Sequence, residues 1–287
     1  MIVVTGATGH LGRLVIADLL SRAVPAAGIA AVVRDRARAA DLATSGVEIR
    51  VADYEQPRTL PGAFAGADKL LFISSVGPDD ARLAQHHAVV DAAAEAGVGL
   101  LAYTSIVQAD TSPLRLAEIH RATEKAIATT GLPSVILRNG WYTENHTAAL
   151  PTAVQLGALV GGAGQGRIAS ASRADFATAA AAVLTTPGHA GRVYELTGDT
   201  AWNLPELAAE LSARTGRAIG YQNLSASEYT AILTGAGLPG YLAELLVDAD
   251  LRIAEGALAT VTDDLRTLIG RPSTPLSESV AAALGDG

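Results

Sequence analysis

The chain has no cysteine, few aromatic residues and fewer positive than negative charges. Without Cys among its 287 residues, it cannot form disulfide bonds, use a thiolate nucleophile or bind a metal through thiolates. Aromatic residues make up 4% of the chain and hydrophobic residues 49%, so the core must consist mainly of Ala, Val, Leu and Ile. The formal net charge of −8 argues against a general nucleic-acid-binding protein, which would present a basic surface.

Long hydrophobic runs and targeting signals are also missing. No segment approaches the roughly 20 uninterrupted apolar residues that span a bilayer. The first residues enter a strand pattern without a basic, cleavable leader. We therefore expect a cytoplasmic protein that makes no membrane contact, with one large domain or a large and a small one.

The first twelve residues, MIVVTGATGHLG, are the most informative segment. An apolar strand runs into Gly6, Gly9 and Gly12, and a helical pattern follows at once. In that order, the first glycine allows the sharp turn, the second lets the backbone approach a phosphate, and the third lets the helix pack closely. The segment predicts a pyrophosphate pocket at the start of the helix, the alternative being a tight turn without a ligand. The expected cofactor contacts are Gly6, Thr8, Gly9, His10, Leu11 and Gly12.

Short β-branched runs alternate with helical patterns through the first half of the chain. The expected strands are residues 2–4, 29–33, 47–51, 69–73, 100–104 and 135–138. The expected helices are residues 10–21, 37–43, 58–64, 81–96 and 114–130. Because the strands are apolar on both faces, the pattern predicts an α/β Rossmann fold with a doubly wound parallel sheet.

The pattern changes after Asn139. The glycine-dense segment 157–166 is expected to be an exposed hairpin or loop, and most of the remaining pattern is helical. We expect residues 1–140 to form the dinucleotide-binding domain and residues 141–287 a smaller, mixed and mostly helical substrate-binding cap. Helix 173–185 is expected to pack back on the first domain. The substrate would lie between the two parts, beyond the carboxyl ends of the strands.

The end of the second strand favours NADPH over NADH. NAD-preferring folds place a carboxylate there, about 20 residues past the glycines. Here the strand ends in Arg34, whose planar fork suits a 2′-phosphate. Asp35 is the alternative NAD-type acid, but it lies one residue into the loop and is expected to point elsewhere. The arginines of this segment could instead form the solvated start of a helix.

Other strand ends supply further candidate cofactor contacts. Asp53 and Tyr54 follow the third strand and suit an adenine ring, unless Asp53 caps the next helix. Ser74 and Ser75 follow the fourth strand and place small side chains where a ribose would pass. The remaining candidates are Tyr103, Thr104, Ser105 and Lys125.

Longer segments carry a family resemblance. They include GATGHLG, ADY, LLFISS, LLAYTS, ADTSPL, RNGWYTEN, RIASASRADFA, VYELTGD and LIGRPSTPLSESV. The chain resembles the NmrA-like branch of the atypical short-chain dehydrogenases, and within it the bacterial type-2 NADPH:quinone oxidoreductases. The resemblance covers nearly the whole chain and implies an NADPH-dependent reductase that passes hydride to a quinone without flavin. Some NmrA-like proteins instead bind NADP(H) with little or no turnover and act as redox sensors, and a conjugated enone is a further possible acceptor.

One departure from the wider superfamily concerns the general acid. Short-chain dehydrogenases carry a Tyr four residues before a Lys, whereas Arg121 precedes Lys125 here. A quinone needs less help, because hydride addition yields a delocalised, aromatising anion, so positioning and a polar contact suffice. The candidate catalytic residues are Asn139, Tyr142 and Asn145, which follow the sixth strand. Alternatively, Trp141 and Tyr142 pack the joint between the domains while the asparagines bond the backbone.

Histidines and acids elsewhere have open interpretations. His120 and Glu124 lie four residues apart on a helix and could pass a proton or form an ordinary surface pair. His86 and His87 are adjacent and face different directions, and since no acidic cluster has ligand spacing we expect no metal site. The sequence leaves open the oligomeric state, monomer or homodimer, and the identity of the quinone.

Overall fold

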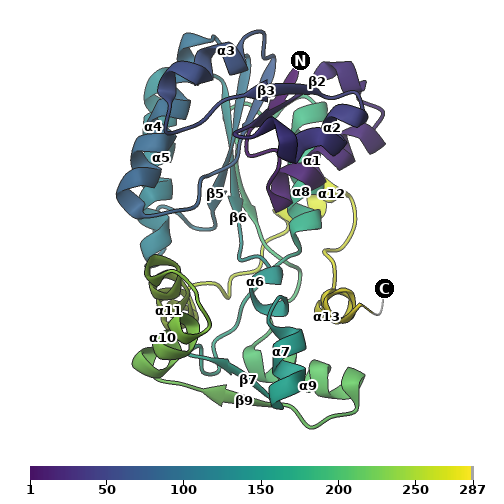
Figure 1. Ribbon diagram of the computed structural model, residues 1–287, viewed down its shortest axis with the longest axis vertical. Helices are drawn as coiled ribbons and strands as arrows, with labels where there is room; N and C mark the ends of the chain where they lie inside the picture. The colour runs from purple at the N-terminus through teal and green to yellow at the C-terminus, as the bar shows by residue number, and fades with distance from the viewer. Residues whose placement is uncertain (286–287) are drawn as a thin grey trace.

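The computed structural model describes residues 1–285 and has a sheet-centred part and a cap, which lie above and below in Figure 1. Seven parallel strands form the central sheet in the order β3-β2-β1-β4-β5-β6-β8. They are β1 (Ile2–Val4), β2 (Ile29–Val33), β3 (Glu48–Val51), β4 (Lys69–Phe72), β5 (Leu100–Ile106), β6 (Ser134–Asn139) and β8 (Val193–Leu196). The order reverses direction between β1 and β4, which confirms the predicted doubly wound Rossmann fold.

Helices cover both faces of this sheet, as strands that are apolar on both sides require. One face carries α1 (His10–Ser21), α2 (Ala40–Thr44), α8 (Arg173–Thr185) and α12 (Asp264–Ile269). The other face carries α3 (Leu60–Phe64), α4 (Asp79–Glu95) and α5 (Arg115–Thr130). Within residues 1–285, none of the helices combines the length and the apolarity needed to cross a membrane.

The second half of the chain returns to the sheet more than once. α8 packs beside α1, and α12 packs on α8 and β8 (Figure 1). β8 extends the sheet by pairing with β6, and Leu196 at its end is buried in the core. A single boundary after residue 140 therefore assigns β8 and α12 to the cap, whereas they belong to the layers of the sheet.

The cap is mostly helical and contains a small second sheet. Its helices are α6 (Glu144–Thr147), α7 (Leu150–Leu156), α9 (Leu204–Thr215), α10 (Ala226–Gly235), α11 (Gly240–Ala254) and α13 (Leu276–Leu284). β7 (Ala158–Gly161) pairs in parallel with β9 (Gly220–Asn223). Its apolar core includes Trp141 and Trp202.

The glycine-dense segment 157–166 is therefore only partly the exposed loop that the sequence predicts. Its first half is the strand β7, whose Leu159 is buried. A Cβ on Gly166 would lie 2.1 Å from the carbonyl oxygen of Ile253 on α11. At this position glycine permits close packing against a helix, and the sequence analysis misread that requirement as loop flexibility.

Candidate functional site

The turn between β1 and α1 forms an open backbone cradle at the reversal point of the sheet. Gly6 has a φ of +58°, and its carbonyl oxygen accepts a hydrogen bond from Gly9 N at 2.9 Å. A Cβ on Gly12 would lie 2.4 Å from Gly6 O, so glycine lets α1 begin this close to the sheet. Gly6, Gly9 and His10 are exposed, which leaves the first N–H groups of α1 open to an anion. Thr8 is half-buried and Leu11 packs in the core.

The end of β2 separates the two candidate residues for recognising the ribose. Asp35 turns back, and its Oδ1 accepts a hydrogen bond from Ala37 N at 2.9 Å, capping the 3-10 turn Arg36–Ala39. Arg34 directly follows the strand and its side chain is exposed. Asp35 is thus engaged with the backbone, while Arg34 is accessible to a phosphate.

Asp53 and Tyr54 lie at the carboxyl end of β3. Asp53 Oδ1 accepts a hydrogen bond from Glu55 N at 3.1 Å, which closes a turn; the next short helix is instead preceded by Gln56. The Tyr54 hydroxyl donates to Ile73 O at 3.1 Å, and burial raises the pKa of this phenol. Tyr54 therefore spans the ends of β3 and β4 as a neutral, half-buried ring.

A cavity of about 320 Å³ lies beyond the carboxyl ends of β4, β5 and β6, between the sheet and the cap. On the sheet side it is lined by Ser74, Ser75, Ser105 and Asn139. On the cap side it is lined by Tyr241, Leu242, Leu245 and Leu246 of α11. Polar strand ends thus face an apolar helix, an arrangement typical of pockets for small ring-shaped ligands.

The three candidate catalytic residues all line this cavity. Asn139 Nδ2 donates a hydrogen bond to the Tyr142 hydroxyl oxygen at 3.3 Å, so the phenolic O–H is directed to another acceptor. Arg173, the first residue of α8, lies over the Tyr142 ring at 4.8 Å from its centroid and donates to Asn145 Oδ1 at 2.9 Å. Burial raises the pKa of Tyr142, so the phenol keeps its proton at neutral pH.

Sequence reasoning missed Arg173 as a site residue. The available signal was its position directly after Ser172, whose side chain caps the N-terminus of α8. This helix cap predicts where α8 begins but not that this end of the helix reaches the cavity. The position of Arg173 at the cavity depends on the packing of α8 against the sheet, which no local sequence pattern predicts.

Three further residues that the sequence suggested as cofactor contacts do not line the cavity: Tyr103, Thr104 and Lys125. Tyr103 is fully buried under α4 and α5, with its hydroxyl 2.7 Å from His120 Nδ1. Thr104 is buried in the sheet, where its Oγ1 accepts a hydrogen bond from Ser74 N at 3.0 Å. Lys125 is exposed on α5. Over residues 1–285, no cluster of His, Asp or Glu is arranged to hold a metal ion.

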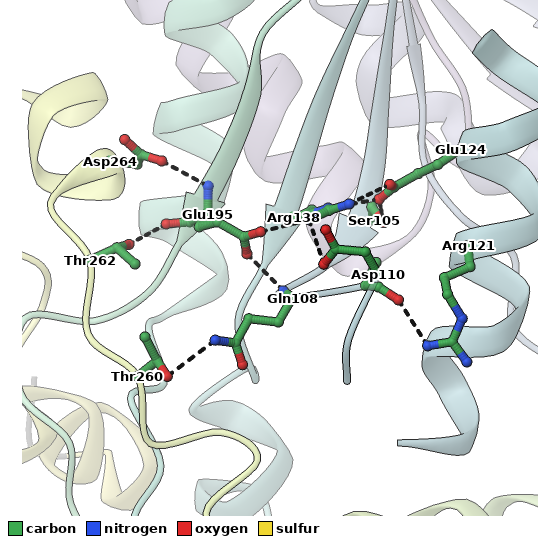
Figure 2. A network of polar contacts seen from close by, with 11 residues as sticks. Ser105, Gln108, Asp110, Arg121, Glu124, Arg138, Glu195, Thr260, Thr262 and Asp264 are labelled. Carbon is green, nitrogen blue, oxygen red and sulfur yellow. Dashed lines mark hydrogen bonds and ion pairs between the residues drawn. The ribbon is translucent and has the colours of Figure 1, made fainter. Parts of the chain in front are cut away.

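The buried Arg138 is the centre of a network of polar contacts that includes Ser105, a residue of the cavity wall (Figure 2). Arg138 forms ion pairs with Glu124 at 2.7 Å, Glu195 at 2.8 Å and Asp110 at 3.1 Å. The Ser105 hydroxyl donates to Glu124 Oε1 at 2.5 Å. Hydrogen bonds from Arg138 to Glu124 raise the pKa of the guanidinium, and the network ties β5, β6, β8 and α5 together under the site.

Comparison with known proteins identifies the family of the chain. The model of the NAD(P)H-binding family matches residues 6–187. The chain belongs to this family. Quinone oxidoreductase 2 of Escherichia coli (strain K12) is 49% identical over 98% of both chains. The resemblance predicted from the sequence is confirmed by this nearly full-length match.

Solved structures of the family share the fold in detail. The crystal structure of an NADPH-dependent quinone oxidoreductase from Escherichia coli, complexed with NADPH, has a TM-score of 0.95 at 48% identity and covers 99% of this chain and 100% of that chain. The Citrobacter sp. triphenylmethane reductase complexed with NADP(H) has a TM-score of 0.95 at 43% identity, covering 99% and 100%. Members of the family thus share this architecture and differ in the acceptor that they are named for.

Proposed function

We propose that the protein is an NADPH-dependent quinone oxidoreductase of the cytoplasm that transfers hydride directly to a quinone, without flavin. The observation that carries the proposal is the cavity where Asn139, Tyr142 and Asn145 meet the apolar face of α11. The 49% identity to quinone oxidoreductase 2 of Escherichia coli supports the choice of acceptor. Bound NADPH would supply the hydride.

The residues of the first half fit a phosphorylated dinucleotide. The open N–H group of the exposed His10, at the start of α1, would face the pyrophosphate. The exposed Arg34 would bind the 2′-phosphate through its planar fork. Tyr54 would pack against the adenine, and Ser75, which lines the cavity, would lie beside the ribose nearer the substrate.

The residues that line the cavity would orient the quinone. Tyr142 is a neutral phenol whose oxygen already accepts from Asn139, so its proton is available to a quinone oxygen. Asn145 is held by Arg173, which fixes the amide beside the ring. The leucines of α11 exclude water from the remaining wall. Such preorganised groups orient the ring and polarise the quinone oxygen that they contact, without a dedicated proton donor.

A second candidate function is a nucleotide sensor of the NmrA type. The observation in its favour is Arg121, which stands where short-chain dehydrogenases carry their catalytic Tyr. Arg121 donates to the carbonyl oxygens of Ala109 and Ser112 at 2.9 and 3.1 Å, so it supports a loop and is no general acid. A sensor would bind NADPH tightly and turn over no acceptor.

Steady-state NADPH oxidation tests the two functions against each other. The purified protein is assayed with benzoquinones, naphthoquinones and one conjugated enone, with NADPH or NADH, and without added flavin. The enzyme predicts rapid, saturable turnover that favours NADPH and a quinone. Tyr142→Phe should then lower kcat about tenfold, because one hydrogen bond to the quinone is lost, and leave NADPH affinity unchanged. Tight NADPH binding without turnover would establish the sensor instead.

A further inference from the structure

Arg82 is a buried cation in the wall of the cavity. It comes from α4, and only 4% of it is exposed. Its Nε donates to Ser75 O at 2.8 Å. In the part of the chain that the structure describes, no carboxylate forms an ion pair with it, and Asp79 of the same helix is paired with Arg115 at 2.8 Å. Burial lowers the pKa of this guanidinium and the nearby charge of Asp79 offsets part of that effect; a buried cation without a direct ion pair is costly unless a ligand supplies an anion.

A second donor, His120 of α5, lines the same cavity. Ser75 N donates to His86 Nε2 at 3.0 Å, so the proton of the neutral His86 ring sits on Nδ1, 2.8 Å from Thr123 Oγ1. Tyr103 OH lies 3.5 Å from that protonated Nδ1 and therefore donates to His120 Nδ1 at 2.7 Å. In the neutral His120 ring the proton must then sit on Nε2, at the edge that Tyr103 does not occupy.

Both imidazoles are held neutral by their surroundings. Burial lowers the pKa of His86 to about 3, and it lowers the pKa of His120 well below its usual range. The nearby charge of Arg82 lowers both pKa values further. Glu124, the acid that the sequence offers to His120, is bonded to Arg138 instead. Neither of the two sequence interpretations of a His120–Glu124 pair holds.

We propose that Arg82 and His120 form a two-donor oxyanion site for one quinone oxygen. The proposal rests on the proposed function and extends it. Hydride addition at the other quinone oxygen would break the C–H bond of the donor, and the hydride electron pair would form the new O–H bond. The π electrons of that C=O bond would move into the ring, which becomes aromatic, and the π pair of the second C=O bond would become a lone pair on the second oxygen. The oxygen in the Arg82–His120 site then carries the negative charge, and water supplies the proton that completes the hydroquinone.

The two ends of the quinone would thus meet donors from opposite layers. Arg82 and His120 come from α4 and α5 on one face of the sheet. Tyr142 packs against the core of the other face, beside Arg173 of α8. A ring with two opposed oxygens, as in a para-quinone, would place one oxygen at each set of donors.

The test compares Arg82→Gln, Arg82→Lys and His120→Gln with two exposed controls, Arg58→Gln and His87→Gln. Single-turnover oxidation of bound NADPH by 1,4-naphthoquinone should slow roughly 10²-fold in Arg82→Gln and in His120→Gln, as when one oxyanion donor is removed. Arg82→Lys should recover part of the rate, while the controls and the Kd for NADPH should not change.

A second readout does not depend on turnover. The ionised form of 2-hydroxy-1,4-naphthoquinone carries its charge on a ring oxygen and mimics the charged product. It should bind the wild-type NADP⁺ complex more tightly than neutral 1,4-naphthoquinone does, and Arg82→Gln should lose this preference. Arg82 and His120 lie on different helices, so if one variant does not fold the other still provides the test.

The outcomes distinguish a failure of the proposed function from a failure of the oxyanion site. A wild-type protein that turns over no quinone contradicts the proposed function. Normal wild-type turnover with unchanged rates and unchanged anion preference in Arg82→Gln and His120→Gln overturns the oxyanion site alone. A large loss of NADPH affinity in Arg82→Gln also overturns it, because the guanidinium would then serve the nucleotide.

Discussion

A single exposed side chain at the end of β2 should decide between the two nicotinamide nucleotides. Asp35 is engaged in capping a turn, which leaves Arg34 as the group that meets the ribose. Arg34→Ala should weaken NADPH binding roughly 10- to 100-fold, the cost of charge-assisted hydrogen bonds, and NADH binding little. Fluorescence titration with both nucleotides measures this, with Arg38→Ala on the same turn as the control. Equal losses for NADPH and NADH would contradict the assignment to the 2′-phosphate.

A buried acid in the cap should give the protein a distinct pH dependence. Asp250 of α11 accepts a hydrogen bond from Gly162 N at 2.6 Å, and burial raises its pKa to about 6. The folded state therefore holds a proton that the unfolded state has lost, and stability falls as the pH rises from about 4 to about 6. This carboxyl should cost roughly 3 kcal/mol at pH 7.

The variant Asp250→Asn tests the predicted direction of the pH dependence of stability. Removing the charge should raise the free energy of unfolding at about pH 7 and change it little near pH 4, because the wild-type carboxyl is already neutral there. Urea unfolding at both pH values measures the difference, with the exposed Asp80→Asn as the matched control. A variant that is less stable at pH 7 than the wild type would rule out the destabilising role.

Among the elements, hydrophobic periodicity located most of the sheet-centred part from the sequence. β1, β2, α1 and α8 begin and end at the predicted residues. β7 was missed because glycines of the segment 157–166, Gly161 at the end of the strand and Gly166 beyond it, serve close packing against α11, a contact that is absent from the local sequence. Depth along a strand was also beyond the sequence: Tyr103 and Ser105 lie two residues apart on the same face of β5, yet Tyr103 is fully buried and only Ser105, nearer the carboxyl end, lines the cavity.

The same reasoning explains which site residues were found. Those that follow a strand, such as Asn139 and Tyr142, could be predicted, because parallel strands end at a common edge. Arg82 and Arg173 reach the cavity from helices, and their positions depend on how those helices pack. An arginine on a helix is ordinarily a surface residue, so no pattern distinguishes these two.

Because α1 packs closely on the glycine turn, we expect that adding a single methyl group at Gly12 destabilises the protein. In Gly12→Ala the new Cβ would lie 2.4 Å from Gly6 O and 2.8 Å from Ala7 Cα, both rigid backbone atoms. We expect α1 to move outward, with a loss of at least 1–3 kcal/mol as in overpacked cores and weaker NADPH binding. Gly62→Ala in α3 is the control, since nothing lies within 4 Å of its Cβ and alanine favours helix. Thermal unfolding and NADPH titration of both variants measure the contrast.

For the whole molecule, the network around Arg138 joins segments that are far apart in the sequence. Figure 2 shows Glu195 of β8 between Arg138 and the segment that leads to α12. The Thr262 hydroxyl donates to Glu195 O, and Asp264 accepts from Glu195 N at 2.8 Å. Gln108 N donates to Glu195 Oε2 at 2.7 Å. The network therefore holds β8 and the segment that leads to α12 against β5 and β6, the strands whose ends line the cavity.

Arg138→Met should consequently destabilise the whole fold. Arg138 and Glu124 are only 10% and 15% exposed, so the variant leaves Glu124 and Glu195 poorly solvated and without their counter-charge. The expected loss is about 3–5 kcal/mol, as when one partner of a buried ion pair is removed. Arg167→Met is the matched control: Arg167 also pairs with a carboxylate, on Glu206, but both side chains are nearly half exposed, and such pairs contribute about 1 kcal/mol or less.

Urea unfolding of both variants, at equal salt, separates burial from pairing as the source of stability. The double variant Arg138→Met with Glu124→Gln should recover part of the loss, because the second change removes one of the stranded charges. Equal, small losses for Arg138→Met and Arg167→Met would mean that the network is hydrated in solution and does not fasten β8 to β6. A large loss at Arg138 with a single cooperative transition would show that the cavity floor and the returning chain unfold together.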